Sequence, residues 1–169
     1  MLCKAVRVAL TETLTTGKEK VADGNVPEPF SRKAGVFVCI KKNGRLRGCM
    51  GTIYPLTSNI LAEAYRNAVC AATRDPRFPP VTLRELPDLH FTVDILTAPE
   101  PISDESFLDP KRYGVIVRSG HRSGLLLPDL EGVDSPRQQV MISLQKGGIR
   151  PDEPYTLLRF EVSRYEEEI

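Results

Sequence analysis

The sequence lacks tryptophan, and only 7% of its 169 residues are aromatic. Proteins that bind single-stranded nucleic acid usually stack bases on aromatic side chains, so this shortage argues against such a surface. The net charge of +1 points the same way, because nucleic-acid-binding domains usually carry a basic excess. The composition therefore makes nucleic acid an unlikely partner.

Long apolar runs are also missing, and none approaches the roughly 18 residues of a membrane-spanning helix. Residues 1–17 read MLCKAVRVALTETLTTG, with Lys4 and Arg7 inside the apolar pattern rather than before it. That order differs from a signal peptide, in which the charges precede a continuous apolar block. We expect no membrane segment and a cytoplasmic location.

Metal-ligating residues are few: four cysteines and two histidines, with no C-x-x-C pair. A zinc ribbon or finger needs such pairs, so we expect no metal. No dinucleotide-binding, P-loop, G-x-S-x-G or H-E-x-x-H motif occurs either, and the sequence implies no cofactor. Without an export signal, the four cysteines are expected to be free thiols.

What is present predicts an α+β fold with flanking helices and a mixed, largely antiparallel sheet, because hairpins require antiparallel pairing. Asn43-Gly44 is the signature of a tight hairpin turn. Thr57 or Ser58 is expected to cap the second helix. The long connection 97–112 is a candidate boundary between two subdomains that share a core. Apolar periodicity predicts helices over 1–16, 57–74 and from Ser135-Pro136 onward, and strands over 35–41, 45–52, 89–96, 113–118, 123–127 and 155–162.

The stretch RLRGCMGT follows the predicted turn and stands out chemically. Alternation along a strand puts Arg45, Arg47 and Cys49 on one face, unless a bulge breaks it. Gly48 and Gly51 leave room for close approach to the backbone. A unit charge about 6 Å away, at an effective dielectric of about 20, would lower the thiol pKa by roughly two units. The alternative is that Cys49 packs as a small buried hydrophobe.

A second cluster, Arg74, Asp75 and Arg77, follows the second predicted helix. One interpretation is an anion-binding loop that faces the cysteine strand. The other is that the cations complement the helix dipole and that Asp75 forms a surface pair with an arginine. His90 and Asp94 share the face of a later strand, and we interpret that face as solvated.

Several segments carry a resemblance to a known family. LRGCMGT, AATRDPRFPPV, YGVIVRSGHRSGLLLPDL and QKGGI occur in order between residues 46 and 149. They resemble the AMMECR domain, also called AmmeMemoRadiSam system protein A. The sequence departs from that family's pattern at Met50, where isoleucine is usual, and at Asp129, where glutamine is common. Tyr155 stands where the family has a different aromatic residue.

The resemblance implies a single domain over 1–169 with two subdomains, whose LRGC motif faces a cleft. It also implies association with a Memo-type protein or a radical S-adenosylmethionine protein, and it implies no particular reaction. Three hypotheses follow. The site binds a small polar or anionic ligand and acts through Cys49; the chain is a non-catalytic partner module; or it is an RNA-associated or nucleotide-modifying factor. In the first, the ligand-binding residues are Arg45, Arg47, Gly48, Gly51, Arg74, Asp75 and Arg77.

Overall fold

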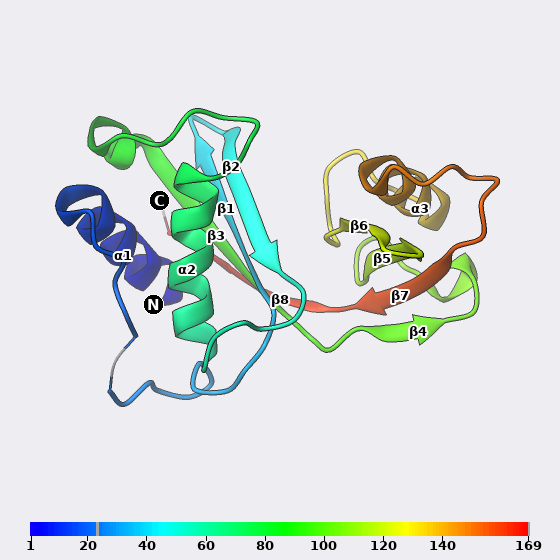
Figure 1. The fold of residues 1–169 in the computed structure, drawn as a ribbon, viewed down its shortest axis with the longest axis horizontal. Coiled ribbons are helices and arrows are strands. Elements are labelled where there is room, and N and C mark those ends of the chain that lie inside the picture. Colours follow the sequence, from blue (N-terminus) through cyan, green and yellow to red (C-terminus); the bar gives the residue numbers. More distant parts are fainter. Residues whose placement is uncertain (23, 169) are drawn as a thin grey trace. The chain divides into compact units, whose positions relative to one another are not determined.

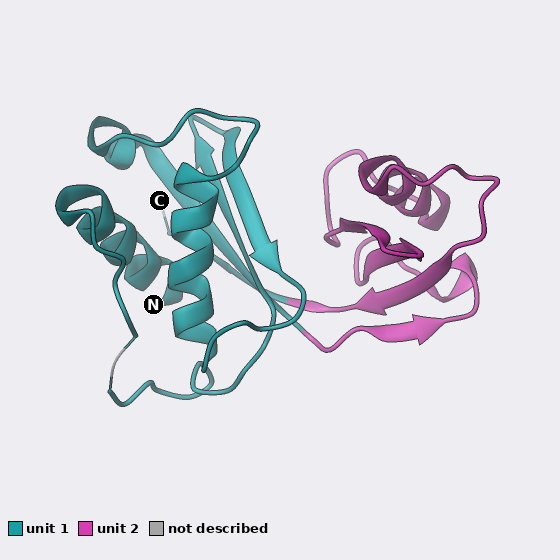
Figure 2. Cartoon of the chain, viewed as in Figure 1, with its two compact units in different colours: residues 1–96, 163–169 teal, residues 97–162 magenta. Residues whose placement is uncertain are grey.

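The computed structural model describes residues 1–22 and 24–168. The chain divides into two compact units (Figure 2). Unit 1 consists of Met1–Leu96 and Ser163–Ile169, and unit 2 of Thr97–Val162. The predicted α+β class is confirmed, and the described strands divide into two four-stranded sheets.

Unit 1 packs two helices on one face of its sheet (Figure 1). The strand order is β2-β1-β3-β8. The buried side chains of β1 (Val36, Val38, Ile40) lie in the same core cluster as helix side chains. The elements are α1 (Leu2–Thr16), β1 (Val36–Lys42), β2 (Arg45–Thr52), α2 (Ile60–Thr73), the 3-10 helix η1 (Leu83–Asp88), β3 (Leu89–Leu96) and β8 (Val162–Glu166).

The other face of this sheet carries the alternate residues of β1, namely Phe37, Cys39 and Lys41. Phe37 and Cys39 are half-buried and Lys41 is exposed, because side chains alternate between the two faces of a strand. We call this the helix-free face. The continuous apolar run of β1 is typical of a strand buried on both faces, yet only the helix-covered face is fully buried.

Unit 2 has its own core beneath α3. Its strand order is β4-β7-β5-β6, and β5 and β6, at the strands predicted over 113–118 and 123–127, form a second hairpin. Ser135 caps α3 and Pro136 occupies its first turn, as predicted. The elements are β4 (Glu100–Ile102), the 3-10 helix η2 (Glu105–Phe107), β5 (Gly114–Ser119), β6 (Arg122–Leu126), α3 (Pro136–Gly147) and β7 (Thr156–Phe160).

Two local predictions need correction. Asn59 caps α2, since its side chain accepts a hydrogen bond from the Ala62 amide. Thr57 instead donates its hydroxyl hydrogen to the fully buried Glu63 carboxylate at 2.7 Å. Thr57 therefore helps to hold the loop before α2 rather than its first turn.

The solvated face predicted for His90 and Asp94 is also wrong at Asp94, which is only 3% exposed. Its carboxylate accepts two hydrogen bonds from the Arg164 guanidinium, both 2.8 Å long. Arg164 lies on β8, near the C-terminus. The strand supplies the partner that allows the carboxylate to be buried.

Candidate functional site

The β1–β2 hairpin contains a disulfide between Cys39 and Cys49. Asn43 (φ 50°) and Gly44 (φ 77°) form the predicted turn. Counting back from this turn in regular register would place Cys39 opposite Gly48. The register shifts between Ile40 and Lys41, however, so that Cys39 pairs with Cys49.

This bulge changes two expectations. Free thiols were predicted at all four cysteines, and this was wrong for Cys39 and Cys49. Cys3 and Cys70 are indeed free, and both are buried. Burial raises the pKa of the Cys3 thiol, and the nearby Glu167 carboxylate raises it further. A disulfide sulfur does not titrate, so the activated thiolate predicted at Cys49 requires the bond to be reduced first.

The bulge also breaks the predicted alternation of side chains along β2. Lys41 pairs with Leu46 and Ile40 with Gly48, so Arg47 is the extra residue between them. Arg47 and Cys49 are therefore not at consecutive positions of one regular strand face. The prediction that Arg45, Arg47 and Cys49 share a face fails because one inserted residue reverses the side-chain order.

Arg47 is bound to the segment that follows α2. Its Nε lies 3.0 Å from Glu85 Oε1 and its Nη2 3.2 Å from Oε2. Its Nη1 donates to the Pro79 carbonyl at 2.9 Å. These bonds lower the pKa of Glu85 to about 2, with help from the Thr82 amide. The Arg47 guanidinium is thus already paired with the Glu85 carboxylate, and its side chain is only 13% exposed. It is not free to bind an added anion.

Asp75 and Arg77 lie beside Cys49 and contact its main chain. In a non-hydrogen-bonded antiparallel pair the main-chain groups point away from the partner strand, and the Cys49 amide donates to Asp75 Oδ2 at 3.0 Å. The Arg77 guanidinium donates to Asp75 at 3.0 and 2.8 Å and to the Cys49 carbonyl at 3.4 Å. These contacts cover part of the outer edge of β2.

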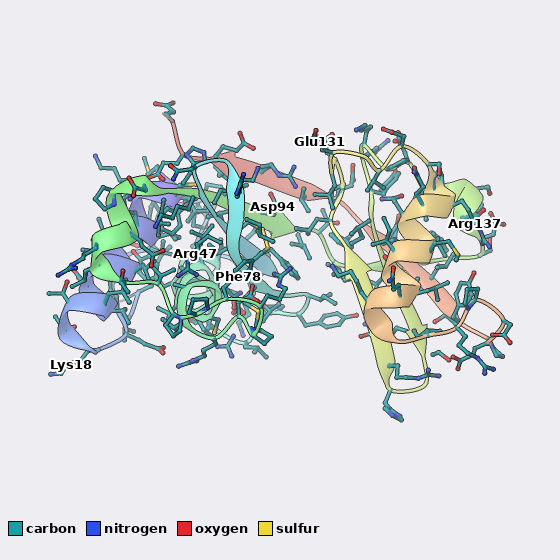
Figure 3. All side chains as sticks on the ribbon, turned by 90° about the horizontal axis from the view of Figure 1, so that it is seen from above. Lys18, Arg47, Phe78, Asp94, Glu131 and Arg137 are labelled. Atoms are coloured by element: carbon teal, nitrogen blue, oxygen red, sulfur yellow. A yellow bond between two sulfur atoms is a disulfide. The ribbon has the colours of Figure 1, made fainter. Side chains whose placement is uncertain are left out.

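The two members of the Asp75–Arg77 ion pair differ in burial. The Arg77 hydrogen bonds lower the pKa of Asp75 to about 2, and the Cys49 amide contributes. The Asp75 side chain is 2% exposed and that of Arg77 54%. Asp75 is therefore a buried carboxylate that holds the main chain of the cysteine strand, while the Arg77 side chain is partly open to solvent. Figure 3 labels Arg47 and Phe78, which mark β2 and this segment.

The remaining predicted residues have other surroundings. Arg74 is exposed and pairs with Glu19 at 2.9 Å. Arg45 is exposed at the end of the hairpin, opposite Lys42. Within the described part of the chain, neither side chain hydrogen-bonds to Cys49 or its neighbours; Arg74 instead ties the end of α2 to the chain that follows α1.

The two glycines serve packing. A Cβ at Gly48 would lie 2.1 Å from the Ala71 carbonyl oxygen of α2, and a Cβ at Gly51 would lie 2.3 Å from the Phe37 ring. Both distances are far below contact distance. The predicted close approach at these glycines exists, and the groups that approach are the chain's own helix and side chain.

The structure brings together three residues that no sequence pattern linked: Cys39, Lys41 and His90. The β1–β3 register is regular and places Cys39 opposite Thr92 and Lys41 opposite His90. The alternation of β1 puts Cys39 and Lys41 on the helix-free face. That alternation was visible in the sequence, whereas the strand pairing was not.

The described residues contain neither a membrane-spanning helix nor a cluster of metal-binding side chains. Over 1–22 and 24–168, no helix is long and apolar enough to cross a membrane. The same residues contain no group of three or more histidine, cysteine, aspartate or glutamate side chains that could hold a metal ion.

Comparison with known proteins gives consistent matches. The family model described as AMMECR1 matches residues 3–169. A protein of Thermotoga maritima is 50% identical over 164 residues, which cover 95% of this chain and 94% of that one. Protein CA_C1420 of Clostridium acetobutylicum is 49% identical over 97% of this chain, which spans only 35% of that relative's length. The crystal structure of uncharacterized protein PH0010 from Pyrococcus horikoshii matches with a TM-score of 0.91 and 33% identity, covering 99% of this chain and 90% of that one.

Proposed function

The chain belongs to the AMMECR1 family, and we propose that its Cys39–Cys49 pair is a reversible dithiol–disulfide that exchanges with a small polar thiol. The observation that carries this proposal is the bulged register, which joins the two sulfurs on the helix-free face of unit 1. Both cysteines are half-buried. A small molecule therefore has partial access to the bond.

The exchange needs no other group to balance. A thiolate attacks one protein sulfur, the Cys39–Cys49 bond breaks, and the other cysteine leaves as a thiolate that takes a proton from water. A second thiolate then attacks the mixed disulfide. It releases the small-molecule disulfide and leaves both cysteines reduced, so that two electrons pass from two small thiols to the protein.

The surroundings of the pair support this role. Asp75 and Arg77 hold the Cys49 main chain from outside the hairpin, while the β1–β3 ladder holds Cys39 from inside the sheet. Because neither anchor is a sulfur contact, both remain when the disulfide opens. The two thiols would then stay opposite each other, which favours closing the bond again.

Counting thiols tests the proposal. The protein is equilibrated with graded ratios of reduced to oxidised dithiothreitol, quenched in acid, denatured, alkylated and weighed. We expect two alkylated cysteines at the oxidising end and four at the reducing end, from the two free and two bonded cysteines. The step between them should be absent in Cys39→Ser and present in Cys70→Ser. Four alkylated cysteines without reductant would contradict the proposal.

A partner role is a second proposal, because Arg77 is exposed yet fixed by Asp75. Such a preorganised cation suits docking to an acidic surface, and the partner we expect from the family resemblance is a Memo-type or radical S-adenosylmethionine protein. Its capture should be lost in Arg77→Ala and kept in Cys39→Ser. Capture that survives Arg77→Ala would count against this surface. For an RNA-associated role we find no favouring contact among the described residues.

A further inference from the structure

We propose that Lys41 and His90 bind the carboxylate of an acidic low-molecular-weight thiol that exchanges with the Cys39–Cys49 disulfide. This inference rests on the proposed exchange function and names its substrate class. It begins with placement. Lys41 is two residues from Cys39 on the same face of β1, and His90 lies directly opposite Lys41 on β3.

The Lys41 ammonium and the His90 ring are available to a ligand. Nearby arginines on unit 1 are hydrogen-bonded to carboxylates: Arg47 to Glu85, Arg77 to Asp75 and Arg164 to Asp94. Within the part of the chain that the structure describes, neither Lys41 nor His90 has a carboxylate oxygen within 4.0 Å.

Of the other charges near the two residues, Glu166 shares the helix-free face, because it lies two residues from Arg164, which binds Asp94 there. Glu166 is on β8, however, and β3 separates β8 from β1 and Lys41. The Glu167 carboxylate feels the charge of His90, but it is held by Arg7 at 2.6 and 2.7 Å. On the neighbouring position of β1, Lys42 contacts Glu85 at 3.1 Å and faces away from the helix-free face. An anion that binds beside Cys39 therefore meets Lys41 and His90 first.

The spacing selects the ligand. Two residues along a strand span about 6.6 Å, so a carboxylate held by Lys41 lies that far from a sulfur that reaches Cys39. This is the length of about two extended peptide residues. Thiols that carry a carboxylate at such a distance, such as short acidic thiol peptides, fit both ends, whereas a neutral thiol fits only the sulfur end.

The same geometry gives the order of the steps. The bound thiolate attacks Cys39 Sγ, on the strand that carries Lys41, and forms a mixed disulfide with it. The Cys39–Cys49 bond breaks, and Cys49 leaves as a thiolate that takes a proton from water. A second acidic thiol attacks the mixed disulfide and releases the small disulfide, which leaves Cys39 reduced.

Rates of disulfide reduction test the proposal. Glutathione and N-acetylcysteinylglycine, whose glycine carboxylates lie one residue beyond the thiol, are compared with neutral 2-mercaptoethanol, and each rate is divided by that of the same thiol with a linear small-molecule disulfide. We expect the normalised rates of the acidic thiols to exceed that of 2-mercaptoethanol. Lys41→Gln should slow the acidic thiols about five-fold, the effect of a unit charge about 4 Å away in water, and leave 2-mercaptoethanol unchanged.

Two controls sharpen the result. Lys42→Gln removes the adjacent lysine on the other strand face and should change neither rate. Added salt should reduce the advantage of the acidic thiols in the unmodified protein and not in Lys41→Gln. His90→Gln should act in the same direction as Lys41→Gln.

The outcomes separate this inference from the function beneath it. Equal normalised rates for acidic and neutral thiols, or an equal slowing of both by Lys41→Gln, would overturn carboxylate binding while leaving exchange intact. No reduction by any thiol under native conditions would instead overturn the exchange function itself.

Discussion

The two hairpins of this chain share one feature of their second strands, a glycine that lies against a helix, and they differ in register, since only β1–β2 has a bulge. In β1–β2 of unit 1, a Cβ on Gly48 would lie 2.1 Å from the Ala71 carbonyl oxygen of α2. In β5–β6 of unit 2, a Cβ on Gly124 would lie 1.8 Å from the Ser143 carbonyl oxygen of α3. In both hairpins the second strand needs a glycine to let a helix approach.

The residue that follows the glycine differs. In unit 1 it is Cys49, which pairs with Cys39, and in unit 2 it is Leu125, which pairs with Ile116. Arg47 directly precedes the glycine of β2, and Arg122 lies two residues before the glycine of β6; each is bound to a carboxylate. Arg47 and the two glycines of RLRGCMGT therefore serve largely to build the hairpin, and the cysteine pair is its distinctive chemistry.

Reduction of the disulfide should produce the largest difference in stability between the two units. The disulfide closes a loop with a sequence separation of 10, which corresponds to about 2.5 to 3 kcal/mol of stability in the chain-entropy account. Urea unfolding of unit 1 should shift by that amount on adding reductant, while hydrogen exchange in β5–β6 stays the same. Cys39→Ser should be insensitive to reductant. An equal shift in both units would break the comparison.

Glycine substitution should affect the hairpins equally. Gly48→Ala and Gly124→Ala each push a methyl group into a helix carbonyl, and overpacking of this kind costs about 1 to 3 kcal/mol. Urea unfolding of each variant measures the cost. A neutral Gly48→Ala with a destabilising Gly124→Ala would show that the β2–α2 contact is looser than the structure implies.

The stability lost on replacing each arginine should be larger where the side chain is more buried. Arg47→Ala leaves Glu85 with Lys42 and with the amide and hydroxyl of Thr82, and it should cost about 2 kcal/mol, in the range for hydrogen bonds to charged groups. Arg122→Ala should cost less, because its side chain is 39% exposed against 13% for Arg47. Urea titration measures both costs. If Arg47→Ala slowed thiol exchange without loss of stability, Arg47 would be a ligand-binding residue after all.

Asp75 should give the smallest effect, visible as a dependence on pH. Its pKa is lowered from 3.8 to about 2 by Arg77, so the folded state favours the charged carboxylate. The resulting stability is fully present above about pH 4 and is lost as the pH falls through 2. Asp75→Asn should lower the free energy of unfolding by about 1 kcal/mol at pH 7, after allowance for the exposed Arg77. It should also make that free energy less dependent on pH between pH 4 and 2. An unchanged pH profile would mean that the pair contributes nothing.

Local signals explain which parts of the fold the sequence could predict. The Asn43-Gly44 turn and the Ser135-Pro136 start of α3 depend on residues that are neighbours in the chain, so both were predictable. The Asp94–Arg164 pair joins residues 70 positions apart, and β8 forms only as part of the sheet. No local pattern announces such a strand.

The candidate site was half predictable for the same reason. The sequence singled out Cys49 and the nearby Asp75 and Arg77, which the structure does bring together. It missed Cys39, because regular counting from the turn puts Gly48 in that place. A bulge depends on how the whole strand fits its neighbours, so a single inserted residue hid the partner of Cys49.

Disulfide mapping tests the central claim most directly. Free thiols of the native protein are blocked in acid, and the chain is digested with trypsin without reductant. Cleavage at the lysines and arginines between the two cysteines gives peptides 34–41 and 48–66, which we expect to find joined by one disulfide and to separate on adding dithiothreitol. Recovery of both peptides in the blocked, unlinked form, or linkage of either to Cys3 or Cys70, would contradict the account.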